Sequence, residues 1–324
     1  MSAKPMIKLV SAQDITFTEV FEQFQVFNKA KNLSPETLRF YEQSKRAVLH
    51  YMGNDFIIAK FTKDTLYNFI NHLRDDKGNK DSTINTHMRS LRAIVNYAAE
   101  RGYMEPIKIS NVRAESPVMP TYTEAELKIL LRKPDMKKAN FAEYRNWVIV
   151  SFLIGTGARC STVCNIKIKD LDLDASEVIF RHMKTRKQIV VPISSTLKGT
   201  LMQYLRVRGG ESNDYLFCEQ CGDMLTTNAL KCAIKKYNHR RGIVKTGIHM
   251  FRHTFAKMFI LAGGNAFVLQ RLLGHADIKM TMKYVTLFGN DLSHNYDTYN
   301  PLDKLTNKKQ YIRVKKCPNI FRKE

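Results

Sequence analysis

The sequence predicts a mainly α-helical protein with one small β-hairpin or sheet, an α+β fold in two domains. Three observations predict it. Apolar residues recur at helical spacing behind capping residues, no strand pattern occurs before residue 110, and one short segment near residue 180 is rich in β-branched residues. With 324 residues, 44% of them hydrophobic, the chain can fill two cores.

Residues 1–104 are predicted to form a helical N-terminal domain. In "LSPETLRFYEQSKRAVLHYM", Ser34 is placed to cap a helix and Pro35 to occupy its first position. "TKDTLYNFINHLRDD" and "STINTHMRSLRAIVNYAAERG" repeat the helical spacing, and Gly102 closes the second of them. A small bundle of helices follows from this pattern.

Residues 105–122 are predicted to be a linker, because they lack periodicity and contain three prolines. Thr123 and Glu126 then form a capping box that opens a second domain, residues 123–300. Within it, "LDLDASEVIFRHMKTRKQIVVPI" places two β-branched runs around a cationic turn. This segment predicts a β-hairpin with Lys184, Arg186 and Lys187 near its tip.

The charge indicates a polyanionic partner. The chain has 52 basic and 30 acidic residues, a net charge of +22. Residues 1–117 hold 17 basic and 13 acidic residues, so the other 35 and 17 give residues 118–324 a net charge of +18. A basic solvated surface without a ligand is the alternative, but a polyanionic partner is the natural inference from a charge of this size. The charge is spread over many segments, unlike that of a membrane-binding amphipathic helix.

No apolar run reaches the about 18 residues that a membrane span needs, and the N-terminus has no signal-peptide pattern. Six cysteines without a regular framework indicate a reducing compartment, so we expect a cytoplasmic protein.

Cys218 and Cys221 of "CEQC", with Cys232 and His239, could in principle bind zinc. Only one C-x-x-C pair exists, however, and no nucleotide-binding loop or acidic pair for magnesium is evident. We expect no metal and no cofactor.

Several residues of the second domain could bind a phosphate. Arg159 follows a Gly-containing turn at a predicted helix start, where the helix dipole favours an anion over a cation. His249 and Arg252 are three residues apart and lie on one helix face, whereas the adjacent His253 is interpreted as structural. Guanidinium groups can each bind two phosphate oxygens.

"LLGHADIKMTMKYV" places His275 nine residues before Tyr284. Taken alone, both residues are typical of half-buried positions without a function. In chain order with the preceding residues, they complete a pattern that resembles the tyrosine recombinases, or phage integrase family. "GTGARCSTV" resembles its first arginine box, "MKTRKQIVVPI" its lysine hairpin, "HMFRHTFA" its H-x-x-R box, and "LLGHADIKMTMKYV" its nucleophile box.

The resemblance covers nearly the whole chain and implies an N-terminal core-binding domain before a catalytic domain. It implies six catalytic residues: Arg159, Lys184, His249, Arg252, His275 and Tyr284. The arginines would bind the scissile phosphate, Lys184 would act as general acid, the histidines would contact the phosphate and handle protons, and Tyr284 would be the nucleophile. Lys184 is preferred to Lys187 because it stands eight residues before Pro192, which is where the hairpin lysine of the family usually stands relative to its Val-Pro pair. Thr162 departs from the family pattern, which has an acidic residue there.

The implied activity is site-specific DNA recombination through a covalent 3′-phosphotyrosine, for integration and excision of a mobile element. Chromosome-dimer resolution, a type IB topoisomerase and a non-enzymatic DNA-binding factor are alternatives. The implied partners are double-stranded recombination sites, a homotetramer on two sites, and accessory DNA-bending or directionality factors, so we expect nucleoid association. Residues 301–324 form a basic tail that would link neighbouring protomers; a dispensable basic appendage is the alternative.

Overall fold

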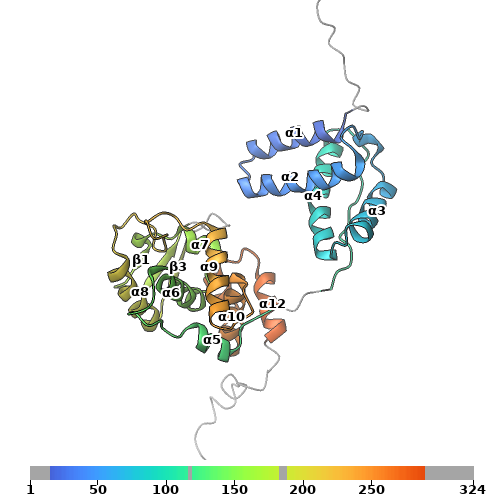
Figure 1. Ribbon diagram of the computed structural model, residues 1–324. Coiled ribbons are helices and arrows are strands. Elements are labelled where there is room, and N and C mark those ends of the chain that lie inside the picture. The colour runs from blue at the N-terminus through green and yellow to red at the C-terminus, as the bar shows by residue number, and fades with distance from the viewer. Residues whose placement is uncertain (1–14, 116–118, 182–187, 289–324) are drawn as a thin grey trace, which may run out of the picture. The chain divides into compact units, whose positions relative to one another are not determined.

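The computed structural model describes residues 15–115, 119–181 and 188–288 (Figure 1). The chain divides into two compact units, residues 1–117 and 118–324. The division falls within the segment predicted to be the linker. The fold is mainly helical with one small sheet, as predicted, and the described helices include none that is long and apolar enough to cross a membrane.

The described part of unit 1 is helical. Ser34 caps its second helix and Pro35 begins it, as the sequence predicts. The first helix has a capping box of Thr16 and Glu19 that the sequence analysis did not single out. The helices of unit 1 are α1 (Phe17–Ala30), α2 (Pro35–Met52), a 3₁₀ turn (Ile58–Lys60), α3 (Lys63–Asn71), a π-helical turn (His72–Asp76) and α4 (Asp81–Glu100).

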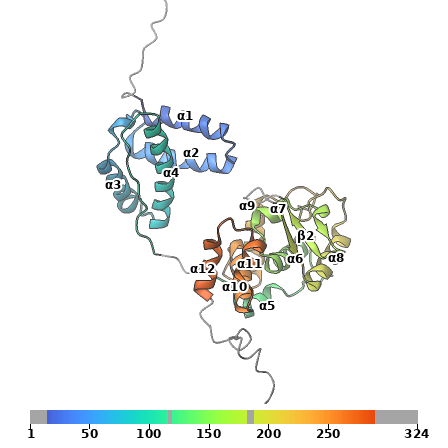
Figure 2. The same ribbon diagram turned by 180° about the vertical axis from the view of Figure 1, so that it is seen from behind.

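Helices α1, α2 and α4 pack against one another around the core of unit 1 (Figures 1 and 2). Its centre includes three fully buried phenylalanines, Phe17, Phe21 and Phe69, with Met88 and Leu91 of α4. These side chains belong to one contiguous cluster of buried residues in unit 1.

The connection between the units is shorter than the predicted linker. Ile109 is buried in the core of unit 1, and its carbonyl accepts a 2.7 Å hydrogen bond from Arg92 Nε. The Asn85 side chain exchanges two hydrogen bonds with the backbone of Val112, at 2.8 and 2.9 Å. Lack of periodicity and prolines excluded a helix here, but they did not exclude packing of an extended segment.

Unit 2 is built around α6 (Phe141–Thr156), whose residues Val148, Ile149, Val150 and Phe152 are fully buried. Helices α8, α9 and α10 pack against α6, α12 packs against α10 and α11, and strand β3 contacts α11 (Figures 1 and 2). The remaining helices are α5 (Glu124–Leu130), α7 (Cys160–Asn165), a 3₁₀ turn (Ile168–Asp170), α8 (Ser195–Arg208), α9 (Thr227–Arg240), α10 (Ile248–Leu261), α11 (Ala266–Leu273) and α12 (Ile278–Phe288).

The predicted hairpin is present as two antiparallel strands, β2 (Glu177–Phe180) and β3 (Ile189–Pro192). A two-residue strand, β1 (Leu171–Asp172), pairs with β2 and completes a sheet of order β1-β2-β3. The predicted tip of the hairpin, with Lys184, Arg186 and Lys187, lies outside the described residues.

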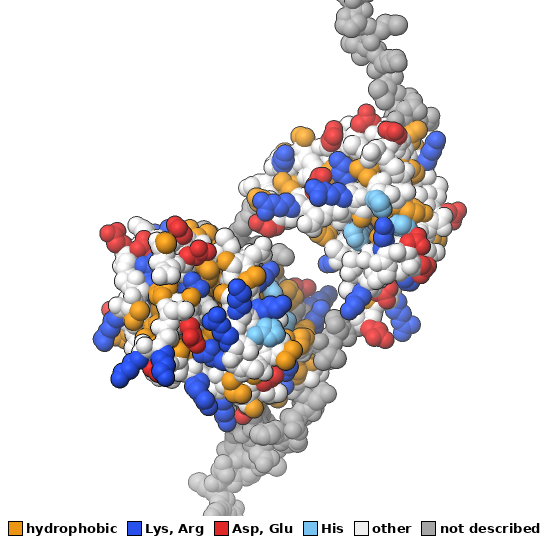
Figure 3. All heavy atoms as spheres, viewed as in Figure 1, with side chains coloured by type: hydrophobic (Ala, Val, Ile, Leu, Met, Phe, Trp, Pro, Cys, Tyr) orange, Lys and Arg blue, Asp and Glu red, His pale blue; other side chains and the backbone are white. Residues whose placement is uncertain are grey.

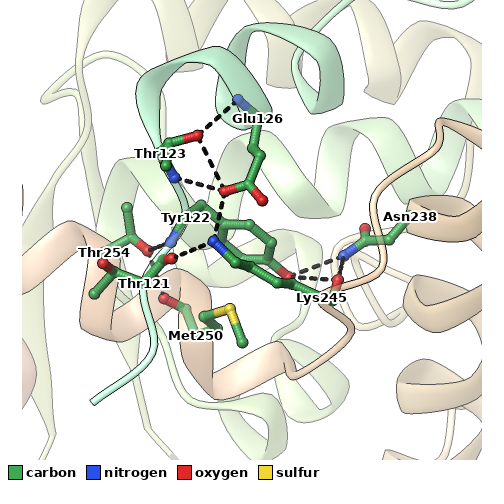
Figure 4. A network of polar contacts seen from close by, with 8 residues as sticks. All are labelled: Thr121, Tyr122, Thr123, Glu126, Asn238, Lys245, Met250 and Thr254. Atoms are coloured by element: carbon green, nitrogen blue, oxygen red, sulfur yellow. Dashed lines mark hydrogen bonds and ion pairs between the residues drawn. The ribbon is translucent and has the colours of Figure 1, made fainter. Parts of the chain in front are cut away.

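A polar network fixes the start of unit 2 to α10 (Figure 4). Tyr122 donates its backbone N–H to Thr254 Oγ1 at 2.9 Å, and its hydroxyl accepts from Asn238 of α9 at 2.9 Å. Lys245 Nζ forms a 2.9 Å ion pair with Glu126, which is the acidic residue of the predicted capping box. Because Tyr122 is buried here, the last residue of the predicted linker belongs to unit 2. The network holds the helix that carries His249 and Arg252.

Candidate active site

Arg159 stands at the N-cap of α7, directly after a turn that begins at Gly157. Gly157 has φ +64°, and a Cβ there would lie 2.6 Å from the Phe255 ring and 2.8 Å from Leu273. Only glycine fits this turn. The Arg159 side chain reaches α11, where Nη2 donates to the carbonyl of Gly274 at 3.2 Å.

Arg252 of α10 is only 5% exposed, and backbone carbonyls hold it. Nη1 donates to the Gly157 carbonyl at 2.9 Å, and Nη2 donates to the Leu273 carbonyl at 2.7 Å. The two arginines are therefore fixed by the same pair of turns, one closing α6 and the other closing α11 at Gly274, which has φ +61°.

Within the described part of the chain, no acidic side chain compensates the charges of these two arginines. Among the described residues, neither guanidinium forms an ion pair with a carboxylate, and Arg159 Nη1 is buried without a hydrogen-bond partner. Burial, and then the neighbouring Arg159, lower the pKa of Arg252 to about 9. Two desolvated cations that repel each other are costly, so a bound anion would stabilise this arrangement.

Both predicted catalytic histidines, His249 and His275, lie beside the arginines. Loss of water around the His249 ring lowers its pKa, although part of the side chain is exposed. The positive charges of Arg252 and Arg159 lower it further. His275 is 8% exposed, and its Nδ1 lies 2.8 Å from Thr281 Oγ1. Burial, and then the same two arginines, lower its pKa to about 4. Both rings are therefore neutral at neutral pH.

Tyr284 of α12 is 3% exposed and lies between two histidine rings. The His275 ring is stacked parallel to it, at 3° and 6.4 Å between centroids, and the His253 ring lies 5.8 Å away. His253 Nδ1 is 2.8 Å from the Tyr284 hydroxyl oxygen. Burial raises the pKa of Tyr284, and Arg252 and Arg159 oppose this effect. The arginines act in the expected direction, but burial is the larger influence.

The structure therefore brings five of the six predicted residues into one site, and Lys184 lies outside the described residues. Thr162 is 4% exposed, one turn after Arg159 on α7. His253, which the sequence analysis interprets as structural, has its ring against the phenol oxygen of Tyr284. Helical spacing could have indicated this, because residues four apart share a face and His253 follows His249 by four.

Sequence reasoning also missed Lys231 of α9. Its exposed ammonium group lies close enough to lower the pKa values of both His249 and Cys160. On the face of unit 2 seen in Figure 3, lysine and arginine side chains surround exposed histidine atoms. No local motif singles out this lysine, because its proximity depends on how α9 packs against α7.

The cysteines considered for zinc do not come together with other ligands. Cys218 is buried, and its backbone forms an antiparallel β-bridge with Met224, whereas Cys221 and Cys232 are exposed. Within residues 15–115, 119–181 and 188–288, no three histidine, cysteine, aspartate or glutamate side chains are grouped as a metal site would require.

Comparison with known families agrees with this geometry. Residues 121–290 match the phage integrase family, and residues 16–112 match the phage integrase SAM-like domain. The chain belongs to the phage integrase family, that of the tyrosine recombinases.

Similar members of this family include the tyrosine recombinases XerA of two Thermococcus species. The tyrosine recombinase XerA of Thermococcus onnurineus is 30% identical over 82% of this chain and 90% of its own length. That of Thermococcus kodakarensis is 29% identical over 89% of this chain and 97% of its own.

Two solved structures share the fold. The Tn1549 transposon integrase in complex with circular intermediate DNA has a TM-score of 0.67 at 21% identity, covering 83% of this chain and 95% of that one. A lambda integrase dimer bound to a COC' core site has a TM-score of 0.68 at 18% identity, with the same coverage.

Proposed function

We propose that this protein is a site-specific DNA recombinase that cuts and rejoins DNA strands through a covalent bond to Tyr284. The observation that carries the proposal is a pair of arginines that have no acidic partner among the described residues and lie beside a buried tyrosine. A phosphodiester supplies the missing negative charge, and the tyrosine supplies the nucleophile. Membership in the tyrosine recombinase family supports this reading of the site.

Arg159 and Arg252 bind the scissile phosphate in this proposal. Attack by the phenol oxygen concentrates negative charge on the non-bridging oxygens, and donors that are fixed in advance stabilise that charge. Both guanidinium groups are already held by backbone carbonyls, so little reorganisation is needed. Arg159 Nη1, which is buried and has no hydrogen-bond partner among the described residues, is the donor that we assign to the phosphate.

The remaining residues contact the phosphate or move protons. His249 borders both arginines and contacts a non-bridging oxygen. Thr281 occupies Nδ1 of His275, so Nε2 is the atom that faces the ligand. Lys184 gives a proton to the leaving 5′-oxygen, as the lysine hairpin implies. The phosphotyrosine keeps the energy of the broken bond, so a second 5′-hydroxyl can restore a phosphodiester without ATP.

The test is covalent trapping on nicked DNA. Wild-type protein forms a gel-stable adduct in the presence of a chelator, because arginines supply the positive charge. Tyr284→Phe binds the same DNA in a band-shift assay but forms no adduct. Tyr215→Phe is the matched control, since this tyrosine of the same unit lies over Lys167 outside the site, and it keeps wild-type trapping. An adduct formed by Tyr284→Phe contradicts the proposal.

For the biological role we propose integration and excision of a mobile element, in association with the nucleoid. Resolution of chromosome dimers is the alternative for the same chemistry. Direct repeats that flank the encoding gene, and recombination between them by the purified protein, test the first role. A topoisomerase-like enzyme would relax supercoiled plasmid without joining the cleaved strand to a second duplex. Assaying relaxation and strand exchange side by side therefore distinguishes a topoisomerase from a recombinase.

We further propose that the active form is a homotetramer on two DNA sites, assisted by accessory bending or directionality factors, and that residues 301–324 link the protomers. A chain truncated after Asn300 then binds one site more weakly and with a shallower salt dependence, because phosphate contacts are lost. It fails to form the two-site complex and to recombine. Unchanged two-site binding and recombination would make this segment dispensable.

A further inference from the structure

The hydroxyl of Tyr284 has one hydrogen-bond partner among the described side chains, His253. Nδ1 of His253 lies 2.8 Å from the hydroxyl oxygen, and the two rings are inclined at 43°. His253 follows Arg252 directly on α10, so the fixed guanidinium and the imidazole are carried by the same turn of helix. The geometry of the phenol is therefore tied to that of the phosphate site.

The phenol must lose its proton in order to attack. A tyrosine hydroxyl has an ordinary pKa near 10 and is a weak nucleophile while protonated. Here burial raises the pKa of Tyr284 further, and the two arginines only partly offset that rise. Electrostatic stabilisation by the cations alone leaves the phenol protonated, so a proton acceptor is needed at its oxygen.

His253 is the acceptor that the site provides. Burial lowers its pKa, and His249 and Arg252 lower it further, so the ring is neutral at neutral pH. A neutral imidazole has one nitrogen that accepts a hydrogen bond. Of the other two histidines, His275 uses Nδ1 toward Thr281, and no hydrogen bond joins His249 to Tyr284 within the described part of the chain.

We propose that His253 is a further catalytic residue, the general base that takes the proton from Tyr284 and later returns it. In cleavage, the phenolic O–H bond breaks and the proton passes to His253 Nδ1. The phenol oxygen bonds to phosphorus, and the bond from phosphorus to the 5′-oxygen breaks. In rejoining, the incoming 5′-hydroxyl displaces the phenol oxygen, which recovers the proton from His253. Negative phosphate in the site offsets the charge that His253 acquires.

This inference rests on the proposed role of Tyr284, and single-turnover trapping tests it separately. His253→Asn keeps an oxygen near the position of Nδ1 that can accept a hydrogen bond but is not basic. His253→Ala removes both properties. We expect both variants to bind DNA normally and to form the adduct about 10²-fold more slowly, the lower end of the effect of general-base catalysis. His239→Asn, an exposed histidine of α9, is the matched control with no loss.

Three readouts separate a base from a positioning group. Added imidazole partly restores His253→Ala. The rate of both variants rises about tenfold per pH unit below the pKa of the phenol, because solvent must remove the proton. A fluorinated tyrosine at position 284, which is more acidic, shrinks the difference between wild type and variant. DNA with a 5′-bridging sulfur restores neither variant, because it assists only the leaving group.

Wild-type rates in His253→Asn, with an unchanged pH profile, would overturn the general-base role even if His253→Ala fails to fold. A slow His253→Asn variant that is restored by bridging sulfur would assign His253 to the leaving group instead and would also overturn it. If wild-type protein itself forms no adduct, the proposed function fails, whatever the variants do.

Discussion

Two regions of unit 2, the small sheet and helices α10–α12, differ in how a buried charged side chain is compensated. On the sheet side, the buried carboxylate of Asp170 is paired with Arg181 at 2.5 Å. On the side of α10–α12, Arg252 is almost as buried but is held only by carbonyl oxygens. A buried charge that the fold compensates is structural, whereas one left uncompensated beside a second cation indicates an external partner.

A third buried arginine supports the distinction. Arg145 is 6% exposed and also donates to neutral groups, the Cys218 carbonyl and Asn146. Burial lowers the pKa of Arg145, and Tyr204, Cys218 and then the carboxylate of Glu219 oppose this effect. For Arg252, Tyr284 is the one described group that raises the pKa, and the neighbouring Arg159 lowers it. Arg252 thus differs from Arg145 in having a second arginine, and no carboxylate, among the described groups that act on its pKa.

The largest expected effect comes from removing an uncompensated arginine. Arg252→Ala should slow adduct formation by about 10³-fold, because a fixed donor to the developing charge is lost. Arg241→Ala, which removes a cation paired with Glu143 at 3.3 Å, should change the rate less than about threefold. Single-turnover trapping measures both, and similar losses in the two variants would end the comparison.

The next effect sharpens the comparison by separating phosphate binding from proton transfer. Lys184→Ala should lose about 10²-fold in cleavage rate, and DNA with a 5′-bridging sulfur should restore it, because sulfur leaves without a proton. The same substrate should not restore Arg159→Ala. Should sulfur restore Lys187→Ala but not Lys184→Ala, the general acid is the other lysine.

A third prediction concerns stability on the cationic side of unit 2. The pKa of His275 is about 4 in the folded protein and near 6.5 when unfolded, so its contribution is complete above pH 6.5. It is lost as the pH falls from 6.5 toward 4, because the unfolded chain binds the proton first. Wild type should lose about 2 kcal/mol more than His275→Asn between pH 7 and pH 5. Parallel losses in denaturant titrations would contradict this.

The smallest effect concerns Thr162, which stands where the family pattern has an acid. Thr162→Ala should reduce the cleavage rate only about tenfold, equivalent to about 1.4 kcal/mol, because a neutral hydroxyl orients its neighbours weakly. The same trapping assay measures it beside Arg159→Ala. A loss as large as that of the arginine variant would mean that Thr162 has a direct role in the reaction.

Local sequence patterns predicted much of this fold. Ser34, Thr123 and the β-branched runs around residue 180 marked elements that the structure contains, because caps and strand propensity act over a few residues. The packing of Ile109 and Tyr122 was missed, since a buried extended segment has no period to detect. The order of motifs indicated the site, but the contact of His253 with Tyr284 depends on how α10 packs against α12.

The most direct test of the central claim is to locate the covalent bond. Wild-type protein would be incubated with nicked DNA in chelator, the adduct digested with nuclease and protease, and the peptides sequenced by mass spectrometry. The proposed function predicts a nucleotide attached to Tyr284 and to no other residue. Attachment elsewhere, or an adduct that forms only with a divalent metal ion, would contradict it.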